Sequence, residues 1–171
     1  MIVMKSIKPA RLKSDAFRLE MLNEMRKAGT EIKKDFAKTT ATWEHKPKFE
    51  VLVSLTGPGP VVLVGTDDKV YRYVSEGTRK NYPIWAGIYT GKSNKKVLAF
   101  RGTFRAKTVP RVLGSGPGFK GGALVLRPYV IHPGIKAREF DVMIQKMWEA
   151  KFKRCMEAAM VRAAAKSGHG A

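Results

Sequence analysis

The middle of this chain lacks acidic residues. From Gly77 to Arg138, a stretch of 62 residues contains no Asp or Glu but has 13 Lys and Arg. The surface of a globular protein normally mixes both signs of charge, because a field of one sign repels itself and attracts anions. The stretch is therefore predicted to face an anionic partner or to be neutralised within an assembly.

Cysteine and long apolar runs are also scarce. Cys155 is the only cysteine, which excludes an internal disulfide and a zinc site built from several thiolates, and which suits a reducing compartment. The first residues, Met1 to Lys5, lack the long apolar region of a signal peptide. No apolar run reaches the roughly 18–20 residues that span a bilayer. We therefore expect a soluble protein that is made in the cytoplasm and has no membrane partner.

Residues suited to catalysis or metal binding are few and scattered. His45, His132 and His169 have no Cys, His or carboxylate at ligand spacing, and the Asp67-Asp68 pair is typical of a turn. A hydrolase needs a nucleophile, an oriented base and an oxyanion donor, and the acid-free stretch leaves few positions for such a set. We expect no metal, no cofactor and no catalytic residue, and hence a protein that is not an enzyme.

One glycine-rich segment matches a nucleotide-binding pattern in its letters alone. The segment 116–121 fits G-x-G-x-x-G, which binds a pyrophosphate only where a strand leads in and a helix begins at the last glycine. The residues that follow, Ala123 to Leu126, are typical of a strand, so the pattern predicts no nucleotide site. The G-x-x-G match to a KH domain fails similarly, because that loop joins two helices.

The length and composition fit one folded domain with an excess of positive charge. The chain has 171 residues, 44% of them hydrophobic, and a formal net charge of +19. This charge divides into +5 over 1–47, +11 over 48–137 and +3 over 138–171. Because counter-ion release lets such a surface bind nucleic acid even where nucleic acid is not its partner, the charge indicates an anionic partner class and no more.

The hydrophobic pattern predicts two helices and four strands. Apolar residues at steps of three or four predict one helix over about 15–38, with Ser14 as its N-cap, and another over about 138–165, ended near Gly168. Apolar runs predict strands over 49–55, 61–64, 97–103 and 123–131, with turns at 57–60 and 66–69. We therefore expect the α+β class: an antiparallel sheet of about four strands, packed by a long N-terminal helix and a long C-terminal helix, with extended loops.

The expected domain organisation is simple. It consists of an N-terminal arm over 1–13, a single α+β domain over 14–166 and a flexible tail over 167–171. Within the domain, the segment 114–122 has five glycines in nine residues and no pattern that would pack, so we expect a mobile loop there.

Aromatic residues interleave with the basic residues of the middle stretch. Bases stack on such side chains in single-strand binding proteins, whereas aromatic residues and Arg are also enriched in protein interfaces. Both interpretations stay open, and an interface is the favoured one. The residues concerned are Tyr71, Tyr73, Tyr82, Trp85, Tyr89, Phe100, Phe104 and Phe119.

Two segments carry a resemblance to a known family. One runs from Arg72 to Arg79 with Tyr82-Pro-Ile84 after it, and the other runs from His132 to Phe140. With Val97-Leu-Ala-Phe100 between them, they resemble the tail-component family of long-tailed double-stranded DNA bacteriophages, which comprises tail completion and head–tail joining proteins. The positions that match the family's motifs are Glu76, Gly77, Thr78, Pro133, Gly134, Ala137, Arg138 and Phe140.

The resemblance implies a structural virion protein of the phage neck. It implies a homo-oligomeric, sixfold ring between the head connector or adaptor and the tail tube or tail terminator, with possible non-specific contact with DNA in the lumen. Candidate contacts with these partners are Arg79, Lys80, Lys92, Lys95, Lys96, Arg101, Arg105, Lys107, Arg111 and Lys120. The alternative is a basic nucleic-acid-binding protein of the ribosomal or architectural type, which the +19 charge supports.

A further hypothesis concerns one pair of motif residues. Arg138 lies near the expected start of the last helix, where a positive charge is unfavourable for the helix dipole. We therefore expect an acceptor to hold it, and Glu76 is the candidate.

Overall fold

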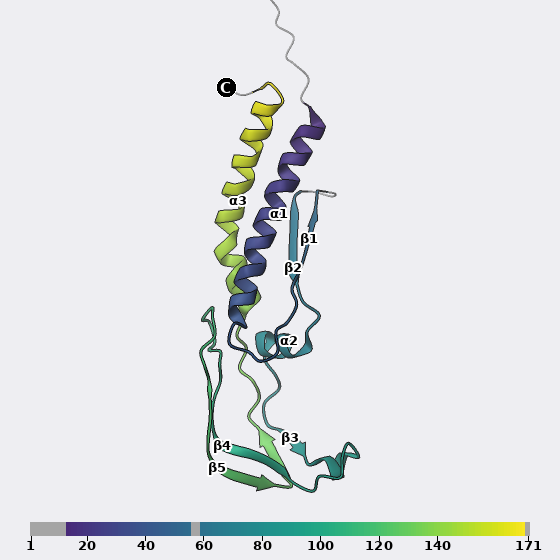
Figure 1. Cartoon of the computed structure of the whole chain (residues 1–171), viewed down its shortest axis with the longest axis vertical. Coiled ribbons are helices and arrows are strands. Elements are labelled where there is room, and N and C mark those ends of the chain that lie inside the picture. The colour runs from purple at the N-terminus through teal and green to yellow at the C-terminus, as the bar shows by residue number, and fades with distance from the viewer. Residues whose placement is uncertain (1–12, 56–58, 170–171) are drawn as a thin grey trace, which may run out of the picture. The chain divides into compact units, whose positions relative to one another are not determined.

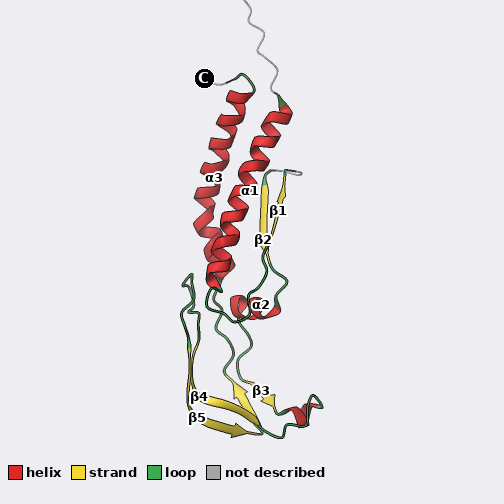
Figure 2. Cartoon of the chain, in the orientation of Figure 1, coloured by secondary structure: helices red, strands yellow, loops and turns green. Residues whose placement is uncertain are grey.

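The computed structural model describes residues 13–55 and 59–169, and within them it has mixed helices and antiparallel strands, which confirms the α+β class (Figures 1 and 2). The predicted N-terminal arm, apart from Lys13, the last two residues of the predicted tail and the first two residues of the turn at 57–60 lie outside the described residues. In chain order the elements are α1 (Ser14–Thr39), β1 (Glu50–Ser54), β2 (Val61–Gly65), α2 (Lys69–Glu76), β3 (Tyr82–Trp85), the 3-10 turn η1 (Gly87–Thr90), β4 (Leu98–Arg105), β5 (Phe119–Arg127), β6 (Tyr129–His132) and α3 (Phe140–Lys166).

The strands form three antiparallel pairs instead of the expected sheet of about four strands. The pairs are β1–β2, β3–β6 and β4–β5. The run predicted as one strand over 123–131 is divided at Pro128, since proline has no N–H to donate to a ladder. The carbonyl of Pro128 instead accepts a hydrogen bond from the Ala86 N–H at 2.9 Å, and β6 begins at the next residue.

The described chain gathers into two compact units. Among the described residues the first comprises 13–33, 50–55, 59–65 and 146–169, and we call it the helix-pair unit. The second comprises Lys34–Phe49 and Thr66–Gln145, and we call it the ribbon unit. The range expected as a single domain, 14–166, thus contains two compact units, and the division falls within both long helices.

The helix-pair unit has a conventional apolar core. Met21 and Met25 of α1 pack with Met156 and Ala159 of α3, and all four are buried. The β1–β2 hairpin adds Val53 and Val62 to this core from the side. Met21, Met25 and Ala159 lie on the apolar stripes from which the two helices were predicted, whereas Met156 was not on the predicted stripe of the second helix.

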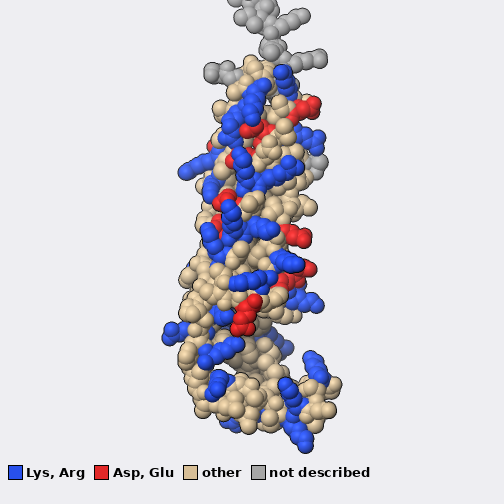
Figure 3. All heavy atoms as spheres, viewed as in Figure 1, with Lys and Arg blue, Asp and Glu red and all other residues tan. Residues whose placement is uncertain are grey.

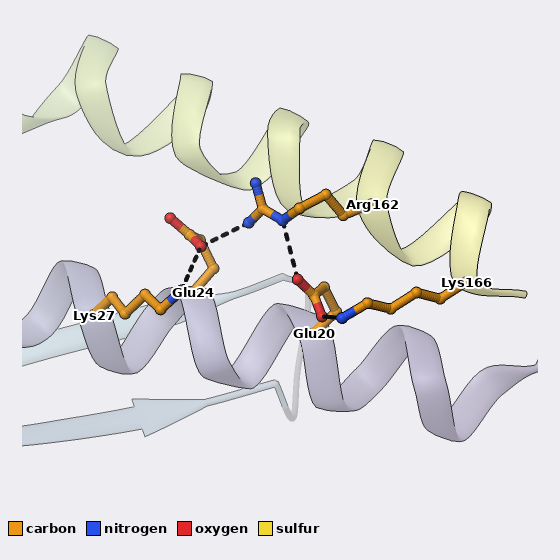
Figure 4. A network of polar contacts seen from close by, with 5 residues as sticks. All are labelled: Glu20, Glu24, Lys27, Arg162 and Lys166. Atoms are coloured by element: carbon orange, nitrogen blue, oxygen red, sulfur yellow. Dashed lines mark hydrogen bonds and ion pairs between the residues drawn. The ribbon is translucent and has the colours of Figure 1, made fainter. Parts of the chain in front are cut away.

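Ion pairs join the two helices beside this core (Figure 4). Arg162 of α3 reaches Glu20 at 3.0 Å and Glu24 at 2.7 Å on α1, and Lys166 reaches Glu20 at 2.6 Å. Hydrogen bonds from Lys166 and then Arg162 lower the pKa of Glu20 below its ordinary value of 4.5. Glu20 and Glu24 therefore already have basic partners within this unit.

The ribbon unit is centred on an aromatic cluster. The ring of Tyr71, on α2, lies 5.1 Å from Phe49, 5.8 Å from Phe140 and 6.4 Å from Phe36, measured between ring centroids. Burial raises the pKa of the Tyr71 hydroxyl to about 12. This cluster fixes α2 against the start of α3.

Helix α2 was not predicted, because the turn expected at 66–69 opens a helix. Asp68 is its N-cap, and its side chain accepts a hydrogen bond from the Tyr71 N–H at 2.7 Å. This bond and the pairing of His45 with the same carboxylate lower the pKa of Asp68. With eight residues, the helix is too short for a clear apolar period, and the Asp that suggested a turn is its cap.

Candidate assembly interface

The structure brings the two motif segments together. Gly77 ends α2 with φ of 83°, and a Cβ at this position would lie 2.7 Å from the Ile135 carbonyl oxygen. Gly134 has φ of 81°, and a Cβ there would lie 2.7 Å from the Arg79 carbonyl oxygen. Each glycine therefore has a positive φ, which favours glycine. The backbone of the other segment also lies so close to its Cα that a side chain would not fit. The segments that carry the family resemblance form one joint.

Hydrogen bonds close this joint from both sides. The Thr78 N–H donates to the Ile135 carbonyl at 2.9 Å, and the Ile135 N–H donates to the Thr78 hydroxyl at 2.8 Å. Phe140 follows as the first residue of α3 and is fully buried in the aromatic cluster, whereas Ala137 supplies the backbone that lies against Gly77. Motif residues at these positions hold the ribbon unit together.

The predicted pair of Glu76 and Arg138 is wrong. Arg138 is only 8% exposed, and its Nε donates to the hydroxyl of Thr108 at 3.2 Å, whereas Glu76 is exposed at the end of α2. Burial lowers the pKa of Arg138. The backbone N–H of Arg138 donates to the Ser75 carbonyl at 3.0 Å, so this residue is anchored through its main chain as well. The acceptor of the guanidinium is a hydroxyl of the long loop before β5.

Both faces of the β4–β5 pair expose large apolar side chains. Successive residues of a strand alternate between faces, so Phe100 and Phe104 lie on one face, and Arg101 and Arg105 lie on the other with their cross-strand partners Leu124 and Phe119. The exposed fraction is 69% for Phe104, 60% for Leu124 and 55% for Phe119. The described residues of the ribbon unit thus leave this hairpin uncovered on both sides.

The β3–β6 pair also exposes large apolar side chains, on one face. Trp85 and Tyr129 are cross-strand partners whose rings lie 4.8 Å apart, and each is 46% exposed. Ile131 on the same face is 55% exposed. On the other face, Ile84 and Val130 are paired and half-buried.

An apolar groove of about 920 Å³ lies between these two strand pairs. Ile84 and Val130 line it from β3–β6, and every residue from Leu98 to Phe104 lines it along β4. From β5 it receives only Lys120. Pro133, one of the motif positions, lies at its border with His132. The groove therefore follows the side of β4 that faces away from β5.

The basic candidate residues lie in three places around these strands. Lys92, Lys95 and Lys96 lie in the segment between β3 and β4, and Arg101, Arg105 and Lys120 lie on β4 and β5. In the view of Figure 3, the part of the ribbon unit that carries these strands shows scattered Lys and Arg among uncharged residues and no acidic side chain. Arg79 and Lys80, before β3, are exposed as well.

Three candidates have intramolecular partners. The Lys107 ammonium donates to the Thr42 carbonyl at 2.8 Å, Arg111 lies 4.0 Å from Glu139, and the Arg101 guanidinium donates to the Gly122 carbonyl at 3.2 Å. Of these three, Arg101 is exposed on a strand and has further N–H donors for a partner.

The loop expected over 114–122 is shorter than predicted. β5 begins at Phe119, so the last four of these residues belong to a strand, and the ring of Phe119 lies over Gly121. Ahead of it, the Gly116 N–H donates to the Lys107 carbonyl at 2.6 Å, and the Thr42 hydroxyl donates to the Gly116 carbonyl at 2.7 Å. Glycine content suggested a free loop because composition does not reveal such partners.

The sequence analysis missed several residues of this surface. Leu98, Val130 and Ile131 were not singled out, and neither was Leu124 or Leu126. One feature of the sequence could have identified them. In β5 apolar residues do not alternate with polar ones, and the run Ala123-Leu-Val-Leu126 places apolar side chains on both faces of the strand. Such a run indicates a strand that is covered on both sides, which the described chain does not provide.

The described residues contain no group of three or more His, Cys, Asp or Glu suited to a metal ion. Over the same ranges, 13–55 and 59–169, none of the helices is apolar enough over a sufficient length to cross a bilayer. No known family model, curated protein or solved structure matches the chain. The function of this surface is therefore inferred from its own residues.

Proposed function

We propose that this chain is a structural assembly protein, a subunit of the neck of a long-tailed double-stranded DNA phage. The observation that carries the proposal is the β4–β5 hairpin, whose apolar side chains are exposed on both faces. A lone two-stranded hairpin is marginally stable in water, and contiguous exposed apolar surface of this kind marks an interaction site. The hairpin therefore needs a covering partner.

The neck location rests on the resemblance of the two motif segments to tail completion and head–tail joining proteins. Their close packing supports treating them as one structural unit of such a subunit. In this proposal the chain is made in the host cytoplasm and ends in the virion, between the connector and the tail tube or terminator. No catalytic role is assigned to it.

The proposed oligomer is a ring of six copies joined by heterologous contacts. An isologous contact through the β4–β5 hairpin would place Arg101 and Arg105 against their own copies, and no acidic residue of the stretch 77–138 is present to offset them. A heterologous contact avoids this repulsion, because the hairpin of one copy then meets a different surface of the next.

A second candidate function is binding of nucleic acid through the same hairpin. Arg101, Arg105 and Phe119 lie on one face of it, and such cations and rings are what single strands use for phosphate contact and stacking. In the neck this surface would meet DNA in the lumen. Leu124 and Leu126 on that face have no role in stacking, so a protein partner accounts for more of the surface.

The test is fractionation of a lysate of the producing cells on a density gradient, with quantitative mass spectrometry of the fractions. We expect the chain in DNA-filled particles at a few copies each, near six if one ring is present. A chain that travels with ribosomes, or stays free with nucleic acid, would contradict the neck assignment and favour the second candidate. The salt dependence of binding to random DNA measures that candidate directly, since use of many phosphates gives a steep slope.

A further inference from the structure

The groove along β4 combines an apolar floor with a free strand edge. β4 pairs only with β5, so its other edge has no strand partner among the described residues. Seven consecutive residues of β4 line the groove. A groove that touched one face alone would be lined by every second residue. The free N–H and C=O groups of β4 therefore face this groove.

A free edge of this length is a template for one more strand. β4 has eight residues, and its edge groups make no backbone hydrogen bond to other described residues. Ile84, Leu98, Phe100 and Val130 offer apolar contacts to alternate side chains of a strand laid there. Strand addition uses this combination, in which the main chain supplies affinity and the pockets supply specificity.

The positive charge of the groove indicates which kind of added strand would bind there. Arg101 and Lys120 line it, Arg105 and Arg127 lie on the same two strands, and neither strand has an acidic residue. A second copy of β4 would bring like charges together, which destabilises directly opposed strands. A phosphate backbone would satisfy the cations but would leave the apolar floor and the strand edge unused.

We propose that this groove binds an extended acidic segment of a partner protein, in which carboxylates alternate with aliphatic side chains, as an additional strand on β4. The carboxylates lie on the face of Arg101 and Arg105 and meet Arg101, and the aliphatic side chains cover the groove floor on the face of Phe100. The inference rests on the proposed function, because it names the partner chemistry of the same assembly surface.

Fluorescence anisotropy with the full chain tests the proposal. The probe is a labelled peptide of about the length of β4 in which Asp and Glu alternate with Val and Leu. We expect saturable binding, and no binding of a peptide in which Lys replaces every acidic residue. Reversal of both cations on that face, Arg101→Glu with Arg105→Glu, should weaken binding about tenfold or more. A control with Lys33→Glu and Lys153→Glu, both exposed on the helices, should retain it.

Two methylated peptides separate strand addition from other binding. In an added strand only every second N–H faces β4. Methylation of one alternate set of amide nitrogens should abolish binding, and methylation of the other set should leave it unchanged. Equal effects of both sets would overturn the strand geometry. This test uses the unmodified chain, so it holds even if the double variant does not fold.

The remaining outcomes overturn the proposal as well. Absence of peptide binding does so, and so does binding of a single-stranded oligothymidylate in preference to the peptide, which would assign the groove to nucleic acid. The particle experiment is independent of these results. Peptide binding without particle association would support the proposed ligand of the groove and contradict the neck location. Particle association without peptide binding would support the neck location and contradict the proposed ligand.

Discussion

The two hairpins β1–β2 and β4–β5 differ in what covers them. In β1–β2 the pairs Val51–Val64 and Val53–Val62 face inward and are half-buried, while Leu52 and Leu63 face outward. In β4–β5 most residues of both faces are exposed. One face of the first hairpin is covered by other residues of the chain, whereas neither face of the second hairpin is covered by the described residues. The difference supports the proposal that the second hairpin is covered by a partner.

The charges differ in the same way. In the helix-pair unit, Glu20 and Glu24 bind Arg162 and Lys166, so acids and bases neutralise one another within the unit. The strands of the ribbon unit from β3 to β6 contain no acidic residue. This contrast supports the proposal that the strands of the ribbon unit meet an anionic partner.

Two phenylalanines of the ribbon unit give the largest contrast. Phe140 is fully buried and Phe104 is 69% exposed. Phe140→Ala should lower the free energy of unfolding by about 3–5 kcal/mol through the cavity it leaves. Phe104→Ala in the free chain should change it by no more than about 0.5 kcal/mol. Urea unfolding followed by circular dichroism measures both, and equal losses would contradict the view that Phe104 is uncovered.

Two glycines test the joint between the motif segments. Gly134 and Gly91 both have positive φ, 81° and 69°, but a Cβ at Gly91 meets nothing within 4 Å. Gly91→Ala should therefore cost only the conformational term, about 1–2 kcal/mol. Gly134→Ala should cost about 1–3 kcal/mol more, because the backbone at Thr78 and Arg79 must move. The same urea titration applies, and similar costs would show that the joint is not close-packed.

Val62 and Leu124 compare the hairpins directly. Val62 packs against the helix core from one face of β2, whereas Leu124 is 60% exposed on β5. Val62→Ser should destabilise the free chain by about 1–2 kcal/mol through lost apolar burial. Leu124→Ser should be near neutral in stability but should impair assembly. Thermal unfolding and native mass spectrometry read the two effects separately, and a stability loss at Leu124 would indicate an unrecognised internal cover.

The smallest expected effect concerns Glu20 and pH. Its pKa is lower in the folded chain, so its contribution to stability is present above about 4.5 and is lost as pH falls through the folded pKa. Glu20→Gln should thus reduce stability at neutral pH and flatten the acid side of the stability curve. Glu157→Gln, an exposed carboxylate on α3, is the matched control. Identical pH profiles for the two variants would show that the ion pairs across α1 and α3 contribute nothing.

The sequence predicted the long helices well because their apolar stripes persist over many turns. Both expected helices match α1 and α3 to within two residues at each end. Short elements were harder. Asp68 signalled a turn and caps a helix, and Pro128 divides a run that has the composition of one strand.

The assembly surface could be predicted only in part. Its excess of Lys and Arg is visible in the sequence, as are Phe100, Phe104 and Phe119. Which apolar residues are left uncovered depends on strand pairing, and the register of β4 against β5 with its irregularity between Arg101 and Thr103 is a long-range property. The Glu76–Arg138 pair failed for a similar reason, since Thr108 reaches Arg138 from a distant loop.

If the proposed function is right, the β4–β5 hairpin is uncovered in the free chain and covered in the assembled particle. Hydroxyl-radical footprinting with mass spectrometry measures this at Phe104, Phe119 and Leu124, with the buried Phe140 as internal reference. We predict strong labelling of these three residues in the free chain and strong protection in the particle. Equal labelling in both states would contradict the claim.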